Sequence, residues 1–172
     1  TNFIHGFPQY CISIALAHRG VVTQAVIYDP VRNDLFTATK GAGAYLNEKR
    51  IRVTKLDRIS NALLGTGYVA GSARALDEYL KMYAIMGERS QGVRRAGSAA
   101  LDLAYVACGR LDGFYEKGLK PWDIAAGALM ITESGGIVGE FSGESDYLYK
   151  GDVIAASPKI FGQMITLLTP FA

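Results

Sequence analysis

Short apolar runs separated by turn residues fill the first 55 residues of the chain. The alternation predicts strands at residues 10–18, 21–28, 35–39 and 44–46, with Gly20 and the Asp29-Pro30 pair in the connections. Such short connections favour an antiparallel meander. Because residues 14–17 are continuously apolar, we expect the first strand to be covered on both faces.

After residue 55 the pattern changes to strands that alternate with helices, which predicts an α/β layer with parallel or mixed strand pairing. Strands are predicted at 62–68, 93–95, 111–116, 137–138 and 153–156, and helices begin near Ser72, Gly97-Ser98, Trp122 and Pro158. The first of these helices carries one apolar face, formed by Leu76, Leu80, Tyr83 and Met86. We therefore divide the chain into residues 1–55, the later part of an antiparallel α+β domain, and residues 56–172, an α/β domain.

Composition and charge narrow the classes of function. The 172 residues are 49% hydrophobic and 20% charged, which is ordinary for a globular protein. A net charge of +2 without a Lys/Arg block argues against nucleic-acid and membrane-surface binding, and no apolar run is long enough to span a bilayer. Cys11 and Cys108 are predicted to be reduced thiols of a cytoplasmic protein. His5 and His18 lack zinc-ligand spacing.

Residues 120–127 contain the most informative carboxylate. Pro121 suits the first turn of a helix, and Asp123 would then lie among the free N–H groups of that helix. Asp123 is interpreted either as a helix cap alone or as a ligand of a metal or of hydroxyl groups. The small residues 125–127 predict that another element packs closely against this helix.

Three further stretches could belong to a site with oxygen ligands. Residues 65–67 follow a predicted strand, Gly97-Ser98-Ala99 opens a predicted helix, and Glu116 ends a strand upstream of Asp123. A helix start favours anions or ligand oxygens, and two carboxylates near it could bind a metal. Each stretch also has a simpler interpretation, as a cap or as a solvated strand end. The sequence contains no nucleophile elbow, Walker loop or dinucleotide-binding fingerprint.

These stretches resemble the inositol monophosphatase family, and most of all its bacterial inositol-1-monophosphatase members. The matching segments are residues 1–8, 28–30, 97–100, 115–116 and 121–127, in the family's order and over essentially the whole chain. The resemblance implies a layered αβαβα fold and a lithium-sensitive, Mg²⁺-dependent phosphomonoesterase that is usually a dimer. It implies hydrolysis of myo-inositol 1-phosphate as the reaction.

The resemblance also implies a role for each matching residue. Asp123 corresponds to a catalytic carboxylate that binds Mg²⁺ and lies near a substrate hydroxyl. Glu116 corresponds to the acid that hydrogen-bonds the inositol ring, and Gly97, Ser98 and Ala99 correspond to the loop that contacts substrate. The family's Glu-Glu pair and Asp-Pro-x-Asp-Gly-Thr motif, which supply its other metal ligands, are not in this sequence. We therefore expect an N-terminally truncated chain that is inactive and aggregation-prone on its own.

Three alternatives stay open from the sequence. The same chemistry could act on histidinol phosphate, fructose 1,6-bisphosphate or a 3′-phosphoadenosine nucleotide. The chain could instead serve as a non-catalytic partner of the transcription machinery in antitermination, as some bacterial relatives do. It could also be an α/β domain without a site of its own.

Overall fold

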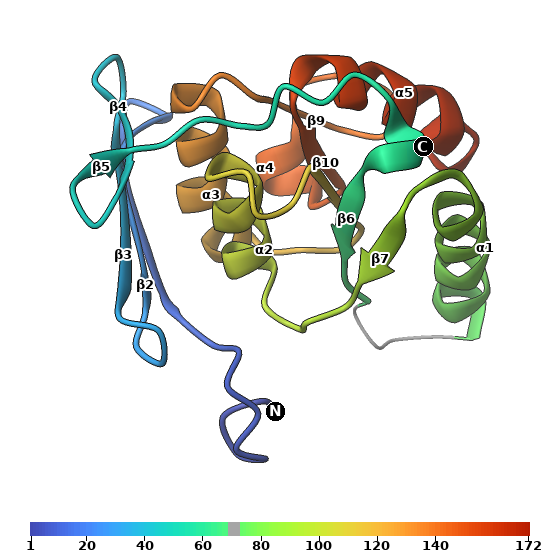
Figure 1. The fold of residues 1–172 in the computed structure, drawn as a ribbon, viewed down its shortest axis with the longest axis horizontal. Helices are drawn as coiled ribbons and strands as arrows, with labels where there is room; N and C mark the ends of the chain where they lie inside the picture. Colours follow the sequence, from blue (N-terminus) through green and yellow to red (C-terminus); the bar gives the residue numbers. More distant parts are fainter. Residues whose placement is uncertain (69–72) are drawn as a thin grey trace.

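Two five-stranded sheets and two layers of helices stack in the computed structural model, which describes residues 1–68 and 73–172. Seen edge-on in Figure 1, the order is a sheet, a helix layer, a second sheet and a second helix layer. The described residues thus form four of the five layers of the predicted αβαβα order. Within the described residues, no helix has the length and apolar content needed to cross a bilayer.

The first sheet is the predicted antiparallel meander, with strands in sequence order. Its strands are β1 (Ile12–His18), β2 (Val21–Asp29), β3 (Asp34–Thr39), β4 (Gly43–Leu46) and β5 (Lys49–Arg50). Arg19 and Gly20 connect β1 to β2 with φ of 51° and 77°, the left-handed pair that a tight two-residue hairpin requires. The short strand β5 was not predicted.

The expectation that β1 is covered on both faces is wrong for the described chain. Ile14 is 60% exposed and Leu16 is 55% exposed. The physical reason is that β1 lies at the edge of the sheet, and helices pack only against one face of this sheet (Figure 1). Ser13 lies on the packed face, where its hydroxyl donates to the carbonyl of Trp122 at 3.2 Å.

The second sheet has the strand order β7-β6-β8-β10-β9 and mixed pairing, as predicted. Strand β6 runs parallel to β7 and β8, whereas β10 is antiparallel to β8 and β9. The bounds are β6 (Leu63–Thr66), β7 (Gly92–Arg94), β8 (Gly113–Glu116), β9 (Ile137–Gly139) and β10 (Val153–Ala156). Side chains of β8 and β10 are buried throughout, because helices cover both faces.

The outer helix layer consists of α1 (Ala73–Arg89) and α5 (Pro158–Leu168). The predicted apolar face of α1 is only partly right. Met86 is buried, but Leu76, Leu80 and Tyr83 are 38–54% exposed, and Met82 is buried instead. The helix is therefore rotated so that Met82 and Met86 meet the second sheet. The predicted start of this helix at Ser72 lies outside the described residues.

Helices α2 (Ala99–Ala107) and α3 (Pro121–Glu133) lie between the sheets, and a short α4 (Tyr147–Lys150) follows β9. The predicted close packing on α3 is confirmed, since a Cβ on Gly127 would overlap with the side chain of Leu103 on α2. The apolar core around α2 and α3 reaches both sheets. The division of the chain at residue 55 stays a prediction.

Candidate active site

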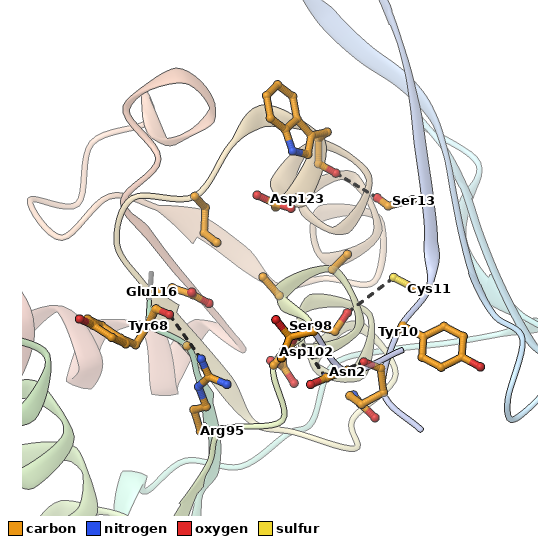
Figure 2. A pocket seen from close by; sticks show the side chains of 18 of the residues that line it. Asn2, Tyr10, Cys11, Ser13, Tyr68, Arg95, Ser98, Asp102, Glu116 and Asp123 are labelled. Carbon is orange, nitrogen blue, oxygen red and sulfur yellow. Dashed lines mark hydrogen bonds between the residues drawn. The ribbon is translucent and has the colours of Figure 1, made fainter. Parts of the chain in front are cut away.

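All five residues that the sequence predicts for a site line one cavity of about 540 Å³. They are Gly97, Ser98, Ala99, Glu116 and Asp123. Figure 2 labels three of them, Ser98, Glu116 and Asp123, among other lining residues that come from the N-terminal segment, β1 and the end of β6. The cavity therefore lies where the starts of α2 and α3 meet, beside the end of β8.

Glu116 ends β8 with its side chain turned into the cavity, although the residue is only 6% exposed. Burial raises the pKa of its carboxyl to about 7; Arg95 lowers this pKa and Asp123 raises it further. Gly67, after β6, leaves the space that this carboxylate fills, since a Cβ at Gly67 would overlap with it. The solvated strand end considered from the sequence is therefore not what the structure shows.

Asp102 is a lining residue that the sequence analysis missed. It lies on α2 and is 2% exposed. Burial raises the pKa of its carboxyl well above the usual range, Glu116 adds to the rise, and Arg95 opposes it. A lone carboxylate within the apolar stretch Ala-Ala-Leu-Asp-Leu-Ala was the available signal. Asp102 and Glu116 together place two buried acids beside one exposed cation, Arg95.

Asp123 occupies the first turn of α3 and is half-buried. Its Oδ2 accepts a hydrogen bond from the N–H of Lys120 at 2.9 Å, so the residue does cap its helix. One hydrogen bond leaves most of the carboxylate's acceptor capacity unused. The cap and the ligand interpretations are therefore compatible with the same geometry.

The loop before α2 presents main-chain groups to the cavity. Gly97 has a φ of +91°, and Asn2 closes over this loop, because its Nδ2 donates both to the carbonyl of Ala96 at 3.1 Å and to that of Gln9 at 2.8 Å. Ser98 lies against Cys11, with 3.7 Å between their Oγ and Sγ atoms. The first N–H groups of α2 have no carbonyl partner within that helix, so its start favours substrate oxygens. The start of α3 offers fewer donors, because Pro121 has no N–H and the N–H of Asp123 donates to the carbonyl of Lys120 at 2.9 Å.

The side chains that line the cavity provide some, but not all, of the ligands that a divalent metal requires. Carboxylates are the hard ligands that Mg²⁺ prefers, and Asp102, Glu116 and Asp123 all line the cavity. Yet no three His, Cys, Asp or Glu side chains in residues 1–68 and 73–172 converge closely enough to hold an ion. The described residues therefore do not form a complete magnesium site, and Asp123 is the one ligand that the resemblance assigns to them.

Two other expectations concern single residues. Cys11 and Cys108 are free thiols and half-buried, and burial raises the pKa of both, which disfavours their thiolate forms. His5 is exposed in the N-terminal loop, consistent with its interpretation as a loop residue.

With this geometry in place, comparison with known proteins identifies the class: residues 1–169 match the model of the inositol monophosphatase family, and the chain belongs to that family. A putative Nus factor SuhB from Neisseria meningitidis is 48% identical over 169 residues, which cover 98% of this chain and 65% of the relative. Nus factor SuhB from Pseudomonas aeruginosa is 46% identical over 172 residues, covering 99% of this chain and 64% of the relative.

Solved structures of the same family share the fold. An extragenic suppressor protein suhB from Bartonella henselae superposes with a TM-score of 0.93 at 41% identity, covering 97% of this chain and 65% of that chain. An inositol monophosphatase from Anabaena gives 0.90 at 36% identity, covering 98% and 70%. The chain thus spans a little under two thirds of the length of the curated relatives described above.

Proposed function

We propose that the protein hydrolyses a small phosphate monoester, with myo-inositol 1-phosphate as substrate and Mg²⁺ as cofactor. The observation that carries the proposal is the convergence of Glu116, Asp123 and the Gly97–Ala99 loop on one cavity. Bound Mg²⁺ would polarise the phosphate ester and activate water, with Asp123 as one ligand. Family membership supports this chemistry.

The chain's own residues would hold the alcohol part of the substrate. The carboxylate of Glu116 accepts hydrogen bonds from ring hydroxyls, and the N–H groups and hydroxyl of residues 97–99 bind further substrate oxygens. Burial of Glu116 keeps water away and strengthens these bonds. The half-buried carboxylate of Asp123 would hold the metal and would lie near a substrate hydroxyl.

The charge of the cavity favours a polyol monophosphate over a bisphosphate. Its lining includes three acids, Asp102, Glu116 and Asp123, against a single cation, Arg95. A second phosphate beside these acids would be repelled. Fructose 1,6-bisphosphate is therefore disfavoured, as are nucleotides that carry more than one phosphate. Histidinol phosphate fits less well, because it offers fewer hydroxyls to Glu116.

The test is phosphate release from each of these esters by the whole protein, with and without Mg²⁺. Asp123→Asn should lower kcat/KM for inositol 1-phosphate by about 100-fold, because a metal ligand is lost. Glu116→Gln should raise KM by about tenfold, because a charged acceptor is lost. Asp77→Asn, on the exposed surface of α1, is the matched control and should have no effect. Turnover of another ester but not of inositol 1-phosphate would refute the substrate; no turnover of any ester would refute the enzyme.

A second function, contact with the transcription machinery, is supported by the relatives that bear the name Nus factor SuhB. We propose that this role does not require catalysis. In a bacterium that lacks its own homologue and grows poorly, the Asp123→Asn variant should then restore growth and still bind RNA polymerase. If this variant loses growth rescue and polymerase binding together with phosphatase activity, the role is not independent of catalysis. A homodimer and a cytoplasmic location are proposed for the same protein.

A further inference from the structure

A second groove, of about 590 Å³, lies at the start of α5 and shares no lining residue with the candidate active site. Its walls are the segment 52–56 that follows β5, the turn at Ser134-Gly135 after α3, and residues 157–159. Figure 1 shows the segment after β5 crossing the molecule toward α5. Three parts of the chain that are distant in sequence therefore form this groove.

The charged residues of this groove all have one sign. Arg52, Lys55 and Lys159 line it, and no Asp or Glu does. None of the three forms an ion pair with a described residue. The carboxylate of the nearby Glu133 is directed to the N–H groups of Gly41 and Gly43, at 2.7 and 2.8 Å, and forms no ion pair with these cations. The lining of the groove therefore carries a net positive charge.

The start of α5 adds hydrogen-bond donors to this charge. The helix has 11 residues and begins at Pro158, and its N-cap residue Ser157 makes no capping hydrogen bond. The N–H groups of Lys159 and Ile160 belong to the first turn, so they have no carbonyl partner within the helix. The positive end of the helix dipole reinforces their attraction for an anion.

Two buried hydroxyls in the same groove lack partners. Ser157 is 2% exposed, and its Oγ forms no hydrogen bond; neither does the Oγ1 of Thr54, in the segment 52–56. Burying a hydroxyl without a partner is unfavourable, because its lost hydration is not replaced by a hydrogen bond. Together with the free N–H groups and the three cations, these two hydroxyls give the groove the donors that an anion with several oxygens requires.

We propose that this groove binds a phosphate group of a small molecule, held by the first N–H groups of α5, the hydroxyls of Ser157 and Thr54, and the cations Arg52, Lys55 and Lys159. Phosphate suits the groove because several oxygens can accept from donors on different walls. The site is separate from the proposed phosphatase cavity. Binding here does not require a metal or catalysis.

The test is a titration of the ¹⁵N-labelled protein with inorganic phosphate, in buffer with a chelator, followed by NMR. The amide signals of Lys159 and Ile160 should shift with saturation. Lys159→Glu should weaken binding by about tenfold, because it replaces a cation with an anion. This variant should fold normally, since an acid in the first turn favours the helix. Ser157→Ala should weaken binding about threefold, in line with the loss of one hydrogen bond.

Lys81→Glu, on the exposed surface of α1, is the matched control and should leave the phosphate affinity unchanged. Saturable shifts confined to Gly97–Ala99 would mean that phosphate binds only in the active-site cavity, and would overturn the proposal. Equal affinity for acetate would overturn the assignment to phosphate. Because no metal is present and no turnover is measured, failure of the phosphatase proposal would not affect this result.

Discussion

The carboxylate of Glu116 fills the space that a side chain at Gly67 would need. Gly67 follows β6 and Glu116 ends the neighbouring parallel strand β8, so the pairing of these strands brings the two residues together. The φ of Gly67 lies outside the left-handed region, which means that close approach, not backbone conformation, requires glycine here. Gly67 thereby determines where the substrate-binding acid of the proposed site can lie.

Gly67→Ala should therefore displace Glu116. We expect KM for inositol 1-phosphate to rise about tenfold with a smaller change in kcat, since the acid binds the alcohol part of the substrate in ground and transition states alike. Steady-state kinetics with Mg²⁺ measures both constants. Gly87→Ala on α1, where a Cβ meets no neighbour within 4 Å, is the control and should leave KM unchanged. An unchanged KM in Gly67→Ala would show that Glu116 is not held by this contact.

A second glycine determines how closely α2 and α3 approach. A Cβ on Gly127 would overlap with Leu103, which is fully buried and cannot move into solvent. Gly127→Ala should lower the free energy of unfolding by about 2 kcal/mol through overpacking. Gly87→Ala should instead raise it by about 0.5–1 kcal/mol, because alanine favours a helix. Urea denaturation of both variants checks the opposite signs; a stabilised Gly127→Ala would contradict the packing argument.

The orientation of α1 gives a matched pair of core and surface changes. Met86 is fully buried against the second sheet, whereas Leu80 is 54% exposed. Met86→Ala should lower the free energy of unfolding by about 2–5 kcal/mol, because it removes buried apolar groups and leaves a cavity. Leu80→Ala should change it by no more than about 0.5 kcal/mol. Equal losses in chemical denaturation would mean that Leu80 is covered in solution.

Local pattern was enough to predict most elements of the fold. The meander, the alternation of strands and helices, and the start of α3 follow from apolar periodicity, turn residues and Pro121, all of which act within a few residues. The inward face of α1 could not be predicted in the same way. Leu76, Leu80 and Tyr83 form as regular a stripe as Met82 and Met86, and only packing against the second sheet distinguishes them.

The candidate site shows the same division between local and tertiary information. The sequence predicts Glu116, Asp123 and the Gly97 loop as site residues because each carries a signal in its own stretch of sequence. The burial of Glu116 depends on Gly67 in another strand, and Asp102 becomes part of the site only because α2 turns it toward the cavity. The groove at α5 likewise combines segments that no sequence motif connects.

The burial of Asp102 should make the free energy of unfolding depend on pH, and replacing this residue should remove that dependence. Burial raises the pKa of this carboxyl in the folded state above that of the unfolded chain, near 3.9. The folded state therefore binds this proton more tightly than the unfolded chain does. The contribution of the protonated Asp102 to the free energy of unfolding is complete below pH 4 and is lost as the pH rises through the folded-state pKa. A neutral asparagine at this position avoids that loss.

We compare the free energy of unfolding of Asp102→Asn with that of the unchanged protein at pH 5 and at pH 8. The variant's advantage should be larger at pH 8 by at least about 1 kcal/mol, because one pKa unit corresponds to about 1.4 kcal/mol. Glu116 and Arg95 face the same carboxyl, so the measurement is repeated in a Glu116→Gln background, where only the Asp102 contribution is compared. Asp77→Asn on the surface should show no pH-dependent difference. If Asp102→Asn has the same effect at both pH values, then Asp102 is already ionised at pH 5, and the cavity solvates this carboxylate despite its burial.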